Sequence, residues 1–172
     1  LFYVGLGFTI LRMIDGYIGD GVMIEAIQGV FHWEKFAWFM GLPLLMQAFL
    51  ISFIFDFGQY WMHRGMHNWY PLWLTHAPHH HVTQLNALKG AVGNPIELVL
   101  ISLSVVALFD FSLAAIFCAI NMGGVISGFA HANVRSNPPL FYSFLFTTIR
   151  HHSLHHSTDY DSTRCNYGNS LI

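Results

Sequence analysis

Histidine is the residue whose number and spacing in this chain point most directly to chemistry. The 172 residues include 12 histidines against 7 Lys and Arg together, and most of the histidines are grouped. An HxxxH pattern contains His63 and His67, and a single His131 stands apart. Two HxxHH patterns contain six more histidines, which are His76, His79 and His80 in one pattern and His152, His155 and His156 in the other.

The spacing within these patterns suits metal binding by helices. Residues three and four apart in an α-helix lie on one face, with Cβ atoms about 5–6 Å apart. Neutral imidazole binds Fe, Zn, Cu and Ni, whereas a tetrahedral zinc site needs only about four ligands. The eight patterned histidines, with His131 as a further candidate, therefore predict a site for two metal ions. We expect no metal role for His32, His81 and His151.

The first HxxHH pattern contains Pro78, which affects the expected geometry. Proline is unfavourable inside a helix but acceptable in the first turn. We therefore expect a helix to begin near Pro78, with the least regular ligand geometry at His76.

Other polar and aromatic residues are candidates for supporting roles. Metal-bound histidines usually donate their second ring nitrogen to a carboxylate, carbonyl or amide. Asp56 lies seven residues before His63 on the same helical face, although a charge at a helix end explains it equally well. Asn133 and Asn166 are weaker candidates for this role. Aromatic residues near the patterns are interpreted as anchors at a membrane interface, and they are Trp61, Trp69, Tyr70 and Trp73.

The elements that must position these residues are apolar. The chain is 54% hydrophobic and 9% charged, far from the quarter of charged residues that is typical of soluble domains. Residues 36–55 carry no charge and predict a membrane-spanning helix. Residues 96–129 are apolar apart from Asp110 and a few small polar residues, and residues 1–11 resemble the end of another apolar helix.

A metal site requires all the histidine patterns to lie on one side of the membrane. A single helix over residues 96–129 would be about 50 Å long, beyond the roughly 30 Å hydrocarbon core. It would also separate His152 from His63. We therefore expect two helices that turn near Asp110. The predicted fold is an all-α, multi-pass membrane bundle with a histidine-rich cap that holds a di-metal site.

The distribution of basic residues predicts an orientation in the membrane, and the net charge argues against one class of partner. Five basic residues are expected on the histidine side, against Arg12 and Lys35 on the other, and they are Arg64, Lys89, Arg135, Arg150 and Arg164. Positive charge favours the cytoplasm, so the histidines are expected to face it. The formal net charge of −2 argues against nucleic acid as a partner. We expect one domain over residues 1–172, with a histidine core at 56–172, as a fragment of a longer membrane protein.

The patterns and their flanking residues resemble the fatty acid hydroxylase superfamily, which includes sterol desaturases. The resemblance covers about two-thirds of the chain, from Asp56 onward. Residues 56–67 are similar to its D-x-x-x-Y-W-x-H-R-x-x-H pattern, and residues 131–133 to its isolated H-x-N. Its HxxHH patterns and N-Y-G-N element are matched at residues 76–80, 152–157 and 166–169.

This resemblance implies a membrane-bound non-haem di-iron oxygenase that hydroxylates or desaturates a lipid with O2. Zinc is a possible substitute for iron in purified protein. The implied substrate is a sterol, fatty acyl chain or related lipid, and the implied electron donor is a cytochrome b5, ferredoxin or reductase. Two alternatives stay open: a zinc-dependent membrane hydrolase, which would need a nearby glutamate base, and a histidine-rich metal-handling membrane protein.

Overall fold

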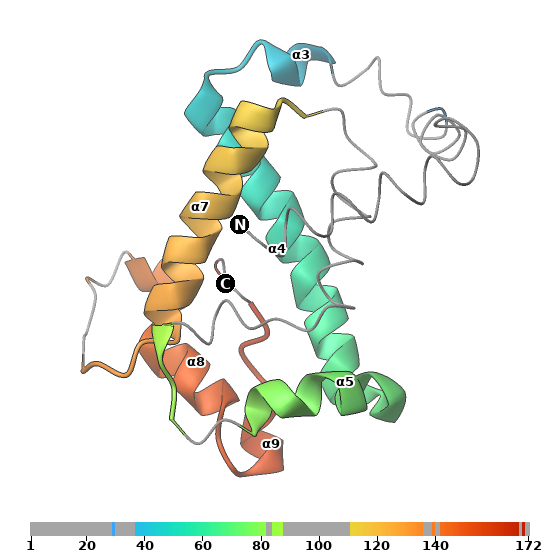
Figure 1. Cartoon of the computed structure of the whole chain (residues 1–172), viewed down its shortest axis with the longest axis vertical. Helices are drawn as coiled ribbons and strands as arrows, with labels where there is room; N and C mark the ends of the chain where they lie inside the picture. Colours follow the sequence, from blue (N-terminus) through green and yellow to red (C-terminus); the bar gives the residue numbers. More distant parts are fainter. Residues whose placement is uncertain are drawn as a thin grey trace. The chain divides into compact units, whose positions relative to one another are not determined.

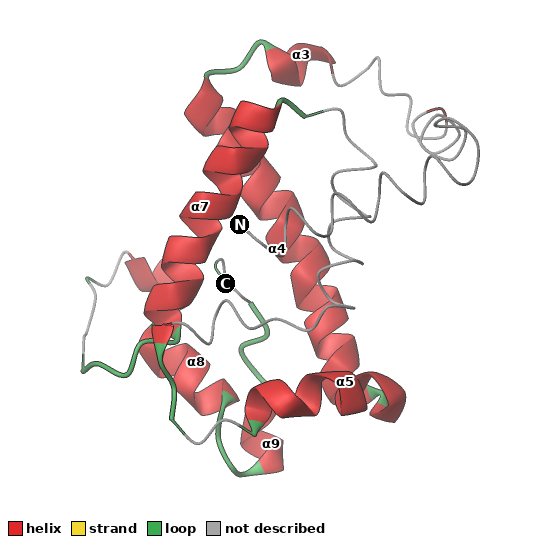
Figure 2. Ribbon diagram, in the orientation of Figure 1, coloured by secondary structure: helices red, strands yellow, loops and turns green. Residues whose placement is uncertain are grey.

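The computed structural model of the chain describes residues 29, 37–81, 84–87, 111–135, 139, 142–168 and 170. The regular structure of these residues is helical, and they contain no β-strand, as Figure 1 and Figure 2 show. The all-α class is therefore confirmed for the described residues. Their elements are α3 (Ala37–Met40), α4 (Leu44–Asn68), α5 (Tyr70–His80), α7 (Leu113–Ala130), the 3-10 segment η3 (Tyr142–Phe144), α8 (Ile149–His155) and α9 (Tyr160–Thr163).

The chain divides into two compact units. The first consists of Leu1–Ile54 and Pro95–Ala119, and the second consists of Phe55–Asn94 and Ile120–Ile172. All nine histidines that were predicted to bind metal belong to the second unit. The expectation of a single domain over residues 1–172 stays a prediction.

The apolar run at residues 36–55 is interrupted near its start. α3 ends at Met40 and α4 begins at Leu44, so the single helix predicted over this run is wrong. The cause is Pro43, because a residue that precedes proline is disfavoured in the helical conformation. The buried side chain of Gln47 covers the break by donating from Nε2 to the carbonyl of Leu42 at 2.8 Å.

α4 is 25 residues long and carries His63 and His67 in its last two turns. One face of this helix is buried at Ala48 and Ile51, and the hydroxyl of Ser52 donates to the carbonyl of Ala119 at 3.5 Å. Another face is exposed and apolar, with large side chains four residues apart at Leu45, Phe49, Phe53, Phe57 and Trp61. An exposed apolar stripe of this size is typical of a surface that contacts another apolar partner, such as lipid or a further segment of protein.

Among the described residues, α7 is long and apolar enough to cross a membrane, judged by length and composition. It ends at Ala130, which places His131 directly beyond the apolar segment. The first of the two helices expected over residues 96–129, the turn near Asp110 and the run at residues 1–11 lie outside the described residues.

α5 begins eight residues before Pro78, so the helix start predicted near that proline is wrong. The start is set by Trp69, which is extended, and by Pro71 in the first turn, where a missing N–H removes no helical hydrogen bond. Pro78 lies in the last turn instead. His76, His79 and His80 therefore lie on one helix.

α8 carries the last histidine pattern, and its start is capped by Thr148, whose hydroxyl accepts the backbone N–H of His151 at 3.2 Å. The chain then returns through α9 to α4. There Ser170 donates both its backbone N–H, at 3.2 Å, and its hydroxyl to the buried carboxylate of Asp56. These bonds hold the segment after α9 against the half of α4 that carries His63.

Candidate metal centre

The structure brings the nine predicted histidines together as two groups. The five-histidine group consists of His63, His67, His76, His80 and His155. The four-histidine group consists of His79, His131, His152 and His156. Within each group one ring nitrogen of every histidine lies within 4.8 Å of the others. Among the described residues neither group includes a cysteine or a carboxylate.

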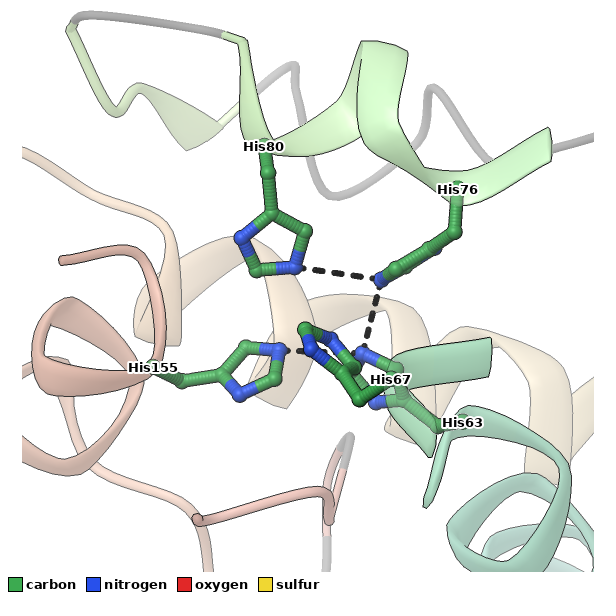
Figure 3. Close-up of side chains that lie close together, drawn as sticks. All are labelled: His63, His67, His76, His80 and His155. Carbon is green, nitrogen blue, oxygen red and sulfur yellow. Dashed lines mark hydrogen bonds between the residues drawn. The ribbon is translucent and has the colours of Figure 1, made fainter. Parts of the chain in front are cut away.

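Three helices supply the five-histidine group, and Figure 3 shows its five side chains lying close together. α4 contributes His63 and His67, α5 contributes His76 and His80, and α8 contributes His155. The side chains from α5 and α8 point toward those from α4 (Figure 3). The Nε2 atom of His63 lies 2.9 Å from that of His76, and His76 Nε2 lies 3.2 Å from that of His80.

The four-histidine group uses α5 and α8 again, together with the end of α7. His79 comes from α5, His131 follows α7, and His152 and His156 come from α8 and its C-terminal cap. The Nε2 atom of His152 lies 2.8 Å from that of His131 and 3.0 Å from that of His156. Both groups therefore depend on the packing of α5 against α8 within the second unit.

The hydrogen bonds of two rings in the five-histidine group determine their tautomers, and these tautomers fit a bound cation. The Nδ1–H of His63 donates to the carbonyl of Tyr167 at 2.9 Å, and that of His155 donates to the carbonyl of Cys165 at 2.8 Å. A neutral imidazole carries one proton, so Nε2 of both rings is a bare acceptor. These two nitrogens nevertheless lie 2.9 Å apart. Two lone pairs repel at this distance, whereas a shared cation would attract both, so the donor set fits a metal ion.

The four-histidine group also fits a metal ion. The Nδ1–H of His131 donates to the carbonyl of Ser127 at 2.7 Å, which directs its Nε2 lone pair into the group. The Nδ1 atoms of His152 and His156 are buried and have no hydrogen-bond partner among the described residues. Buried polar atoms are normally hydrogen-bonded, so this arrangement costs free energy unless other bonds compensate. Bonds from these rings to a metal would supply such compensation.

Burial keeps the imidazoles in the neutral form that binds metal. Desolvation, followed by the neighbouring histidines, lowers the pKa of His80 and of His156 to about 2. Desolvation also lowers the pKa of His155 to about 4, although hydrogen bonds to backbone carbonyls partly oppose it. The pKa of His152 is lowered well below its ordinary value for the same first reason. These rings are therefore neutral at pH 7, as metal ligation requires.

Two aromatic rings form a wall of the five-histidine group. Tyr167 is buried, and its ring centroid lies 5.4 Å from that of His67 and 5.8 Å from those of His63 and His155. The ring of Trp73 lies 5.2 Å from His67. Trp73 therefore contacts the site, while the other expected interface anchors, Trp61, Trp69 and Tyr70, are exposed.

The hydrogen bonds that orient the histidines go to the backbone carbonyls of Ser127, Cys165 and Tyr167, none of which was a predicted candidate. Ser127 precedes His131 by four residues, so helical periodicity could have identified it. The carbonyls of Cys165 and Tyr167 depend on a turn in which Asn166 adopts a left-handed conformation with φ 53°. The only sequence signal for that turn is the N-Y-G-N element, because a carbonyl belongs to every residue type.

The three polar residues predicted to support the ligands lie in different surroundings. The hydrogen bonds of Asp56 described above go to Ser170. The amide of Asn166 donates to the carbonyl of His151 at 3.1 Å, and Asn133 is exposed. A direct role for these three residues beside a metal-bound histidine stays a prediction.

Two of the remaining histidines are described by the structure, and neither joins the two groups. His81 is exposed at the end of α5, and His151 is half-buried on α8 and belongs to neither group. His32 lies outside the described residues.

Comparison with known protein families gives a match over most of the chain. The family model described as fatty acid hydroxylase matches residues 48–172, a stretch that contains both histidine groups. No solved structure matches the chain.

Proposed function

Because this chain belongs to the fatty acid hydroxylase family, we propose that it is a membrane-bound oxygenase that hydroxylates or desaturates a C–H bond of a lipid with O2. The observation that carries the proposal is the division of nine histidines into two groups that share ligands from α5 and α8. Each group has enough ring nitrogens for one ion. The ligands we propose are therefore those of both groups, with His131 included.

Iron is the metal that we propose for both groups. A pair of bound iron ions supplies the redox chemistry that activates O2 and oxidises an unactivated C–H bond. Zinc has no redox chemistry, although imidazoles would accept it as a substitute. A zinc hydrolase also needs a general base, and among the described residues no carboxylate belongs to either group.

The residues of the chain position the metals and exclude water. The carbonyls of Tyr167 and Cys165 fix the rings of His63 and His155, so that both Nε2 lone pairs point into the group. Six histidines are buried, including His67 and His155, and the rings of Tyr167 and Trp73 close one side. A site closed in this way would protect a reactive centre from bulk water.

The apolar elements support a place in the membrane. We propose that α7 crosses the bilayer as one of several spans and that lipid covers the exposed stripe of α4 from Leu45 to Trp61. The basic residues Arg64 and Arg164 belong to the histidine-bearing unit, which supports a cytoplasmic histidine side. The proposed lipid substrate is a sterol, a fatty acyl chain or a related molecule.

We propose that electrons for the reaction reach the metals from a donor outside these 172 residues. The sequence contains no glycine fingerprint for a flavin or nicotinamide and, with two cysteines, no cysteine set for an iron–sulfur cluster. We propose a cytochrome b5, a ferredoxin or a reductase as the donor.

The first test is metal content and identity in anaerobically purified, detergent-solubilised protein. The proposal expects about two irons per chain, one for each histidine group. His155→Ala should lower the iron content to about one or less, whereas the control His81→Ala, outside both groups, should leave it unchanged.

Catalysis is then tested with reduced protein, a panel of sterols and acyl lipids, and isotopically labelled O2. Label in a lipid alcohol, or a new alkene, with wild type and not with His155→Ala supports the proposal. One tightly held zinc, or no stoichiometric metal, would overturn it.

A further inference from the structure

A second functional feature of the histidine-bearing unit is a cavity of about 610 Å³ between α4, α8, α9 and the segment that follows α9. Its polar lining includes Tyr60, Arg64 and Asn68 of α4, His151 of α8 and Arg164 after α9. None of the nine histidines in the two groups lines it. The cavity is therefore distinct from the metal site.

The two arginines are held with their charged ends available to the cavity. The guanidinium of Arg64 donates to the hydroxyl of Tyr60 at 3.3 Å and lies 5.5 Å from the ring of Trp61. The guanidinium of Arg164 donates to the side-chain oxygen of Asn68 at 2.7 Å. Among the described residues no carboxylate forms an ion pair with Arg64. Each guanidinium therefore has at least one neutral hydrogen-bond partner that positions it beside the cavity.

The charge of the lining favours an anion. Asp161 contributes one negative charge, against the two positive charges of Arg64 and Arg164. All three side chains are exposed, so a ligand can enter from solvent. The planar guanidinium group binds phosphate and carboxylate through paired hydrogen bonds, which explains why arginine is preferred for these anions.

The charged groups in the lining disfavour an aliphatic chain as the occupant of the cavity. An acyl chain here would remove Arg64, Asn68 and Asp161 from water without replacing their hydrogen bonds, which is costly. The volume lies within the range of small-molecule sites, about 300–1,000 Å³, and a concave site of this size fits a small ligand better than a protein surface.

The cavity shares a wall with the metal site. Tyr167 lines it and also packs against His63, His67 and His155. Asn166 lines it as well and bonds to the carbonyl of His151. A ligand in the cavity therefore contacts the same turn that orients the metal ligands.

We propose that this cavity binds the phosphate or carboxylate group of an anionic ligand between Arg64 and Arg164. This assignment rests only on the shape and the charged lining of the cavity. The further statement that the anion is the headgroup of the lipid substrate rests on the proposed function, because only then does a substrate need a polar site beside the metals.

The test is calorimetric titration of the purified protein in neutral detergent with three probes: inorganic phosphate, dihexanoyl phosphatidate and uncharged dihexanoyl glycerol. Wild type should bind at least one of the two phosphates saturably and should not bind the uncharged glyceride at the same site. Arg64→Gln and Arg164→Gln should each weaken binding by about tenfold or more, since each removes charged hydrogen bonds. Arg135→Gln is the matched control, because Arg135 is exposed and outside the cavity.

A second variant protects the test against simple misfolding. Asn68→Asp preserves the size of the side chain and an oxygen that can accept from Arg164, adds a negative charge to the lining, and removes the amide donor to the carbonyl of Arg64. It should abolish phosphate binding, and a cooperative thermal unfolding transition on the same sample should show that the variant is folded.

The two phosphate probes separate the sources of the anion. Binding of both probes, with loss in the variants, assigns the site to the phosphate group itself. Binding of phosphatidate alone, with the same losses, assigns it to a lipid headgroup. Absence of saturable binding by either phosphate, or equal binding by wild type and the Arg64 and Arg164 variants, overturns the site.

Iron content measured on the same samples keeps this inference separate from the proposed function. Protein that binds phosphate but holds no stoichiometric iron would contradict the oxygenase and leave the anion site standing. Protein that holds about two irons and binds no anion would contradict the anion site and leave the oxygenase standing.

Discussion

At the scale of the residue, each HxxHH pattern serves both histidine groups. Its first and last histidines, four residues apart, enter one group, and the middle histidine enters the other. In α5 the pair His76 and His80 joins the five-histidine group, while in α8 the pair His152 and His156 joins the four-histidine group. Neighbouring residues on a helix project about 100° apart, so two adjacent histidines can face two different ions.

This division predicts that two adjacent histidines serve different ions. His79→Ala and His80→Ala should each lower the iron content by about half, and the double variant should lose nearly all of it, because one ligand is removed from each group. Mössbauer spectra should show that the single variants retain different iron environments. Retention of the same spectral component by both variants would show that the division is wrong.

The burial of the histidines also predicts a dependence of stability on pH. The pKa of folded His155 is lowered to about 4 from an ordinary value of 6.5. Between these two pKa values the unfolded chain binds a proton at His155 that the folded chain does not bind. The free energy of unfolding must therefore fall as the pH drops through this window.

The measurement is thermal unfolding of metal-free protein at about pH 7 and about pH 5, with a lower midpoint expected at the more acidic value. His155→Gln should reduce the difference between the two midpoints, because it removes one of the titrating groups. An unchanged or higher midpoint at the more acidic pH would contradict the neutral, buried state of these rings.

At the scale of the element, the segment after α9 is the least obvious part of the site. It provides no metal ligand, yet its carbonyls at Cys165 and Tyr167 orient two of them. Its attachment to α4 depends on the buried contact between Ser170 and Asp56. Asp56 therefore positions His63 indirectly, by holding the segment whose carbonyl accepts from that ring.

We therefore expect Asp56→Asn to weaken both the fold and the five-histidine group. Replacement of the charged acceptor should lower the free energy of unfolding by about 1–3 kcal/mol. It should also lower the iron content, because the carbonyl of Tyr167 loses its position. Unfolding midpoints and iron content provide the measurement, and Asp159→Asn, at an exposed position, is the control with little expected effect. Full stability and full iron content in Asp56→Asn would rule out this role.

The sequence predicted some of these elements better than others. The histidines were identifiable because side-chain type and spacing carry the signal for a metal site. The break before Leu44 and the early start of α5 were missed, although Pro43 and Pro71 mark both. The pairing of α5 with α8, and with it the membership of the two groups, depends on tertiary packing that no local spacing contains.

At the scale of the whole molecule, each ion would act as a cross-link between distant parts of the chain. His63 and His155 are 92 residues apart, and His131 and His152 are 21 apart. A ligand that binds only the folded state raises its stability, and the gain increases with ligand concentration relative to the dissociation constant. The metals should therefore contribute to stability as well as to chemistry.

Removal of the metals should accordingly loosen the histidine-bearing unit. Anaerobic chelation of wild-type protein should lower the midpoint of thermal unfolding and increase hydrogen exchange in α5 and α8. A variant that lacks one ligand from each group, such as His79→Ala/His80→Ala, should show little further change with chelator. Equal midpoints for wild type with and without chelator would show that the fold does not depend on the ions.

The distance along the chain between His63 and His155 also bears on how the protein matures. During synthesis α4 and α5 would emerge from the ribosome long before α8. At that stage the five-histidine group would lack one ligand and two orienting carbonyls. The four-histidine group would have only His79 of its four members. If the centre holds two ions as proposed, its loading is complete only after α8 has been synthesised, which makes it a late step in the life of the protein.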